Sequence, residues 1–133
     1  MIGITDTIQR FDGLRSLGAV CASDIEKAEK ELAVSFSPEY KEYTAAFGAV
    51  SFGGREFTGV VKPVSLDVVV VTKAARSITP DAKPDWYIVM DPHFDGIMIW
   101  QSGEGCIYQT EPGKEPRKIA ESLEAYMKKG QEG

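Results

Sequence analysis

The chain has 133 residues, of which 43% are hydrophobic and 26% are charged. This composition is typical of a globular protein, and the length predicts one domain, residues 1–133, with a single core. Fifteen basic and twenty acidic residues give a formal net charge of −5. An acidic chain argues against nucleic acid or an anionic membrane as partner, because both attract basic proteins. A basic protein partner is compatible with this charge.

The amino-terminal sequence and the cysteines indicate the cellular compartment of the protein. No segment approaches the roughly 20 apolar residues that span a bilayer. The first residues, MIGITDTIQRFDGLRSLG, lack a basic flank followed by a long apolar run, so we expect no secretory signal. Cys21 and Cys106 are too few for a disulfide framework. We therefore expect two reduced thiols in a cytoplasmic protein.

The amino-terminal segment predicts a helix over residues 5–17. Ile8, Phe11 and Leu14 recur at helical spacing and would form its buried side, and Gly18 would end it.

Residues 23–48, SDIEKAEKELAVSFSPEYKEYTAAFG, predict two further helices joined by a short break. Ser23 followed by Glu26 is typical of a capping box. Ser37-Pro38 predicts the start of the second helix, because proline is tolerated at the first helical position. The residues at helical spacing are Ile25, Ala28, Glu29 and Leu32 in the first helix, and Tyr40, Tyr43, Thr44 and Phe47 in the second. Gly48 fits the left-handed position that ends such a helix.

The middle of the chain is more ambiguous. Gly53-Gly54 lies between short apolar runs and predicts a hairpin. Pro63 then interrupts the apolar run that follows the hairpin. Four consecutive valines within residues 65–76 favour a strand. Ser65 could instead cap a helix that has Asp67 in its first turn. We expect a helix here, followed by a loop over residues 79–84.

The last third predicts an antiparallel meander and a terminal helix. The expected strands are 86–90, 97–100 and 106–110, with Asp95-Gly96 as a strong turn signal. One face of such a sheet would pack on the core and the other would be free. Residues 111–116 predict an exposed loop and residues 119–129 an amphipathic helix. The expected fold class is α+β, a small antiparallel sheet with amino-terminal helices, a middle helix and a carboxy-terminal helix packed around it.

The order of these motifs resembles the SUKH superfamily, which includes the yeast cell-wall-synthesis regulators and many bacterial immunity proteins. Its members show an aE-x-x-L-x-x-x-L/F-P-x-x-Y-x-x-F/Y run with a glycine soon after. The matching positions here are Glu29, Leu32, Phe36, Pro38, Tyr40 and Tyr43, closed by Phe47-Gly48. The Gly-rich hairpin, the Trp-led strand at Trp86, the Asp-Gly turn, the second Gly-containing hairpin and the helix from Ile119 follow in the family's order. The resemblance implies a helix over residues 65–76 and a non-catalytic protein that binds other proteins.

Metal and cofactor chemistry has little support in the sequence. His93 is the only histidine, so no His-based metal cluster exists within one chain. Asp91-Pro-His93-Phe-Asp95-Gly96 resembles the start of an EF-hand loop, but Ser102 stands where the bidentate glutamate would be. We expect a plain turn and no cofactor.

The sequence also contains no nucleophile elbow and no P-loop. A triad on His93 would need a serine or Cys106 and an aspartate brought together by the fold, whereas Cys106 at a strand start is typical of a small buried hydrophobe. We expect no enzymatic activity.

Partner contacts are expected on the sheet and its acidic loops. Trp86 and Trp100 either lie in the core or anchor an interface, and both interpretations stay open. The candidate contacts are Glu56, Asp91, His93, Asp95, Trp100, Glu104, Tyr108 and Glu111. The resemblance implies a cognate toxin, often a nuclease, as the partner, and the alternative is a regulatory or scaffold module without a toxin. The oligomeric state stays open.

Overall fold

The computed structural model describes residues 3–132 of the chain. Within this range the helices are α1 (Ile4–Gln9), α2 (Ala22–Leu32), α3 (Pro38–Phe47), α4 (Val68–Ile78) and α5 (Leu123–Glu132). The strands are β1 (Arg15–Ser16), β2 (Val50–Phe52), β3 (Arg55–Glu56), β4 (Tyr87–Met90), β5 (Met98–Gln101), β6 (Ile107–Thr110) and β7 (Arg117–Ala120). No helix in this range is long and apolar enough to cross a membrane.

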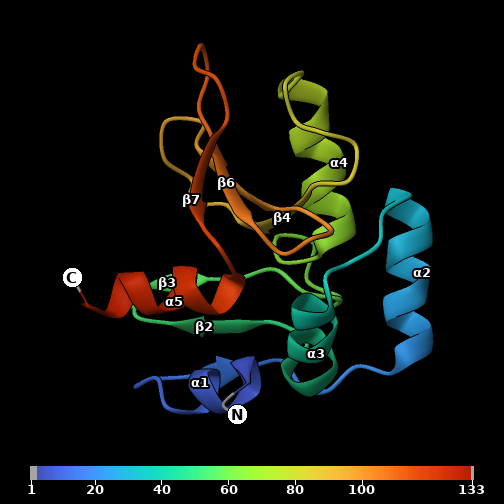
Figure 1. The fold of residues 1–133 in the computed structure, drawn as a ribbon. Helices are drawn as coiled ribbons and strands as arrows, with labels where there is room; N and C mark the ends of the chain where they lie inside the picture. Colours follow the sequence, from blue (N-terminus) through green and yellow to red (C-terminus); the bar gives the residue numbers. More distant parts are fainter. Residues whose placement is uncertain (1–2, 133) are drawn as a thin grey trace.

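The strands form two antiparallel sheets, β1-β2-β3 and the meander β4-β5-β6-β7 (Figure 1). The expected α+β class is confirmed. Thr58, just after β3, connects the two sheets: its N–H donates to the Val89 carbonyl at 2.9 Å and its hydroxyl donates to the Ile88 carbonyl at 2.7 Å. These bonds cover one edge of β4, which would otherwise present unpaired backbone groups.

The predicted amino-terminal helix is much shorter than expected. α1 ends at Gln9 with Arg10 as its C-cap, and the turn that follows contains Gly13, which has a positive φ of 72°. Phe11 is partly buried without being helical, because its ring stacks on Phe52 with centroids 4.2 Å apart. The apolar spacing in this segment therefore reflects contacts with β2 rather than a continuous helix.

The start of α2 differs from the expected capping box. The helix begins at Ala22 with Cys21 as its N-cap, so Ser23 already lies inside the first turn and cannot cap it. The apolar spacing is confirmed, since Ile25, Ala28 and Leu32 are buried.

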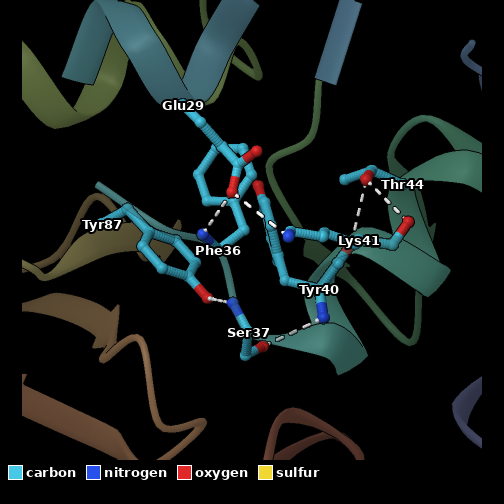
Figure 2. A network of polar contacts seen from close by, with 7 residues as sticks. All are labelled: Glu29, Phe36, Ser37, Tyr40, Lys41, Thr44 and Tyr87. Carbon is cyan, nitrogen blue, oxygen red and sulfur yellow. Dashed lines mark hydrogen bonds and ion pairs between the residues drawn. The ribbon is translucent and has the colours of Figure 1, made fainter. Parts of the chain in front are cut away.

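The start of α3 is confirmed at Ser37-Pro38 and is tied to the meander (Figure 2). The Ser37 hydroxyl accepts from the Tyr40 N–H at 3.0 Å, and the Ser37 N–H donates to the Tyr87 hydroxyl at 2.9 Å. Tyr40, Tyr43, Thr44 and Phe47 are buried as expected, and Gly48 ends the helix with a positive φ of 72°. The Ser-Pro-Glu-Tyr motif thus fixes α3 against β4.

Glu29 holds the break between α2 and α3, as Figure 2 shows. Its Oε2 accepts from the Phe36 N–H at 2.8 Å and lies 3.6 Å from the Lys41 ammonium. The glutamate of the family motif therefore satisfies a backbone donor in the loop that follows its own helix.

The middle helix is confirmed, but its cap is not the expected one. α4 begins at Val68, and the Asp67 side chain accepts from the Val69 N–H at 2.9 Å. Ser65 lies before the helix and does not cap it. The Thr72 hydroxyl accepts from the Ile88 N–H at 2.9 Å, so α4 also covers a backbone donor of β4.

The carboxy-terminal segment contains a strand that the sequence analysis missed. Residues 117–120 form β7 rather than the start of a helix, because Ala120 and Lys118 pair with Ile107 and Tyr108 of β6. α5 begins only at Leu123. Glu39 of α3 caps it: Oε1 accepts from the Leu123 N–H at 2.7 Å, and Oε2 accepts from the Glu124 N–H at 3.0 Å.

Near β4, both faces of the meander are covered. The prediction that one face of the sheet would be free is therefore wrong here. Alternate residues of β4 and β5 point to opposite sides. Tyr87, Val89 and Ile99 join the main core with α2, α3 and α5. On the other face a second cluster packs beneath α4; its buried members are Ala75, Trp86, Ile88 and Trp100. Both tryptophans therefore belong to the core.

Candidate partner-binding surface

The β4–β5 loop, residues 91–97, carries an exposed aromatic side chain. Phe94 is 63% exposed, although most phenylalanines are buried. His93 and Asp95 on either side have positive φ values of 55° and 51°. The Asp95-Gly96 turn is confirmed: Gly96 also has a positive φ, and the Ile97 N–H donates to the Phe94 carbonyl at 3.0 Å. The backbone of this loop holds the Phe94 ring away from the core.

Asp91 organises the first half of the same loop. Its Oδ1 accepts from the His93 N–H at 2.8 Å, and its Oδ2 lies 3.5 Å from His93 Nδ1. The His93 side chain is 71% exposed. This is the geometry of an Asx turn, in which a short acidic side chain bonds to the backbone two residues later.

The tip of the β6–β7 hairpin lies against this loop. A Cβ atom on Gly96 would lie 2.8 Å from the Pro112 ring, so the two segments touch. Glu111, at the end of β6, forms an ion pair with Lys114 at 3.2 Å. In a meander, the first and third connections emerge at the same end of the sheet.

We call the exposed end of the sheet formed by these two segments the loop-end surface; its residues are Asp91, His93, Phe94, Asp95 and Glu111. Four of the eight predicted contacts meet there.

Two predicted acidic contacts lie elsewhere. Glu104 is in the β5–β6 turn, at the opposite end of the meander, where the Gly103 N–H donates to Asp85. Glu56 is exposed on β3, in the other sheet. The eight predicted residues therefore do not form one continuous rim.

The two predicted aromatic contacts do not belong to the loop-end surface. Trp100 is 0% exposed, and its indole N–H donates to the Thr110 hydroxyl at 2.8 Å. Its predicted contact with a partner is wrong, because its position under α4 leaves no atom at the surface. Tyr108 is half-buried and stacks on Trp86, with ring centroids 4.4 Å apart.

The loop-end surface carries more acidic than basic side chains. Its carboxylates are Asp91, Asp95 and Glu111; Asp91 lies beside His93, and Glu111 pairs with Lys114. Among residues 3–132, no group of three or more His, Cys, Asp or Glu side chains has metal-binding geometry. The polar contacts of His93 among the described residues are to Asp91, and they include no hydroxyl or thiol.

Sequence reasoning missed Phe94, the only large hydrophobic side chain of this loop that is strongly exposed. The signal was present in the motif DPHFDG, where a bulky apolar residue stands between turn-forming residues. Because turn residues lie at the surface, an aromatic residue between them is expected to be exposed.

Together, these features describe an α+β protein with an exposed aromatic side chain beside carboxylates at one end of its meander. A family model described as SMI1-KNR4 cell-wall matches residues 22–127. The chain therefore belongs to the SUKH superfamily, as the motif order predicted. A search of curated proteins found no match.

Proposed function

We propose that this chain is a non-catalytic immunity protein that binds and neutralises a cognate toxin in the cytoplasm. The observation that carries the proposal is Phe94, an aromatic ring held 63% exposed between carboxylates in a SUKH chain. Exposed aromatic side chains are frequent anchors of protein interfaces, and acidic neighbours speed encounter with a basic partner.

The loop-end surface suits a toxin that acts on nucleic acid. Such a toxin presents a basic face to its phosphate-rich substrate. Asp91, Asp95 and Glu111 would face those basic side chains while Phe94 fills an apolar depression beside them. Bound in this way, the immunity protein excludes the substrate. A standard interface buries about 800 Å² on each partner, so the contacts would extend beyond these residues.

The alternative function is a regulatory or scaffold module that binds an endogenous protein. The description of the matching family, SMI1-KNR4 cell-wall, supports this candidate. The gene immediately upstream separates the two candidates. A toxin gene there supports immunity, and housekeeping neighbours support the scaffold.

An affinity pull-down from the native organism, with bound proteins identified by mass spectrometry, tests the proposal. We expect a specific partner with toxin activity, and co-expression of this chain should restore growth to cells that produce the partner. Recovery of no specific partner from cells that express the toxin would count against immunity, and an endogenous cell-wall protein would favour the scaffold.

A matched pair of variants tests the proposed surface. Phe94→Ser should abolish recovery of the partner, whereas Ile78→Ser should not, although Ile78 is 67% exposed and equally apolar. Ile78 ends α4 and lies outside the loop-end surface. Equal recovery by both variants would show that Phe94 is not the anchor.

A further inference from the structure

A second surface of the protein has the features of an interface, and it consists of other elements than the loop-end surface. A groove of about 900 Å³ runs between α2, residues 17–21 and residues 60–63. Its apolar lining includes Leu17, which is 53% exposed, together with Val20, Val61 and Val69. An apolar hollow of this size is a candidate binding surface.

One wall of the groove belongs to an exposed loop, Lys62-Pro63-Val64, of which Lys62 and Pro63 line the groove. Val64 is 68% exposed, the most exposed of the large hydrophobic side chains among residues 3–132. The base of the loop is closed by backbone hydrogen bonds: the Leu66 N–H donates to the Pro63 carbonyl at 3.0 Å and the Gly59 N–H to the Leu66 carbonyl at 2.9 Å. A preorganised loop loses little conformational entropy on binding.

The charges of the loop and the groove are complementary. Lys62 forms no ion pair with any residue from 3 to 129. The remaining charged residues of the groove lining are Asp24, Glu31, Asp67 and Lys27. Glu31 is already paired with Lys73 at 3.0 Å, which leaves Asp24 and Asp67 as the carboxylates available to a lysine. The exposed loop is thus apolar and basic, whereas the groove offers two available carboxylates, Asp24 and Asp67, against one lysine, Lys27.

We propose that the chain forms a two-fold symmetric homodimer in which the Lys62–Val64 loop of each copy enters the groove of the other. A two-fold interface uses the same patch on both copies, so that patch must be complementary to itself. This face combines an exposed apolar residue, Val64, with an apolar groove. A chain with a net charge of −5 repels its own copies over most of its surface, and here a lysine meets carboxylates instead.

The dimer leaves the loop-end surface available for a partner. In Figure 1, α2 lies at the right of the molecule, and the tip of the hairpin between β6 and β7 points to the top. The groove and the loop-end surface share no residue. The inference is therefore independent of the proposed function, because a dimer without a toxin partner, or a monomer with one, is possible.

Sedimentation velocity of the full chain over a range from micromolar to near-millimolar concentration tests the dimer. We expect a concentration-dependent dimer that Val64→Asp converts to a monomer. The matched control is Ile78→Asp, since Ile78 has almost the same exposure and lies at the far end of α4. A wild-type chain that stays monomeric throughout, or a dimer that Val64→Asp leaves intact, would overturn the proposal.

A charge exchange tests the docking geometry. Lys62→Glu and Asp24→Lys should each weaken dimerisation about tenfold or more, and the double variant should recover it, because the exchanged charges attract again across the interface. Thermal melting followed by circular dichroism checks that each variant is folded. Failure of the folded double variant to regain the dimer would overturn the proposed contact between the loop of one copy and the groove of the other.

Discussion

Three buried tyrosines connect α3 to both sheets. The Tyr40 hydroxyl lies 2.9 Å from that of Thr58, and the Tyr43 hydroxyl donates to the Thr58 carbonyl at 2.6 Å. The Tyr87 hydroxyl donates to Gln101 Oε1 at 2.9 Å. Burial raises the pKa of each of these tyrosines above its usual value, because a phenolate would be poorly solvated in the core. The three side chains therefore remain neutral hydrogen-bond donors in the folded protein.

The first prediction at the residue scale concerns alkaline pH. Because the folded-state pKa of each tyrosine lies above the unfolded value, their stabilising contribution is intact below about pH 10 and is lost as pH rises through the folded pKa. Each tyrosine should lower the free energy of unfolding by roughly 1.4 kcal/mol per pH unit in that range. Urea denaturation measured from neutral pH to about pH 11 checks this loss.

The matched controls for this prediction are single Tyr→Phe variants. Tyr43→Phe should make the alkaline loss of stability less steep, because it removes a buried hydroxyl whose pKa is raised by burial. If the absorbance of Tyr40, Tyr43 and Tyr87 titrated near pH 10 while the protein stayed folded, their assigned environment would be wrong.

The second residue-scale prediction concerns Glu39, whose carboxylate caps α5 and also accepts from Gln101 Nε2 at 2.9 Å. Glu39→Gln places an NH₂ group against a backbone N–H and removes a negative charge from the helix start. We expect a loss of about 1–2 kcal/mol in the free energy of unfolding. Chemical denaturation measures it, with Glu26→Gln on the exposed side of α2 as control. Equal effects of the two substitutions would contradict the capping role.

At the element scale, α5 is attached at its first turn and at its middle. Glu39 caps its first turn, and Arg55 of β3 donates to the Met127 carbonyl at 2.6 Å. The Arg55 guanidinium also lies over the rings of Phe52, Phe57 and Tyr126, at 5.4, 5.3 and 5.7 Å from their centroids. Arg55 thus connects the β2–β3 hairpin to a helix about 70 residues later in the chain.

Arg55→Ala should loosen α5. We expect a loss of about 2 kcal/mol in stability, and about half of that for Arg55→Lys, which keeps the charge but not the planar group. Hydrogen exchange should show faster exchange of the α5 amides than of those in β5 and β6. Arg15→Ala, at an exposed position of β1, is the control. Uniform exchange throughout the protein would argue against a local role for Arg55.

Among the helices and strands, some were predictable from the sequence and one was not. The type of α2 and α3 and the three strands of the meander were predicted from apolar spacing and turn residues, and these predictions are confirmed. The helix α4 is also confirmed, although its four valines favour a strand and the helix was expected from Ser65, Asp67 and the family resemblance. β7 was missed because its sequence, RKIA, has little strand pattern of its own. It becomes a strand by pairing with β6, which is a contact between segments that no local pattern records.

At the scale of the whole molecule, charge is expected to govern how partners approach. The net charge of −5 and the carboxylates of the loop-end surface should speed association with a basic protein. Salt screens this attraction, with a Debye length of about 8 Å at physiological ionic strength. The association rate therefore reports on the electrostatic part of the proposed function.

We expect the association rate with the partner recovered by pull-down to fall as salt rises. The triple variant Asp91→Asn, Asp95→Asn, Glu111→Gln should associate about tenfold more slowly at low salt, with a smaller change in dissociation. The variant Glu56→Gln, Glu104→Gln is the control, because both carboxylates lie outside the loop-end surface. Unchanged association rates in the triple variant would show that electrostatic steering does not contribute to binding of the partner.

The sequence by itself determined the family, the fold class and the local identity of most elements, because caps, turns and apolar spacing act between near neighbours in the chain. It also brought Asp91, His93, Asp95 and Glu111 forward as candidates. Only the tertiary structure decided that these four meet at one end of the meander, that Phe94 stands exposed among them and that Trp100 is buried under α4. Burial and proximity depend on which distant segments pack together, and a single sequence does not state those pairings.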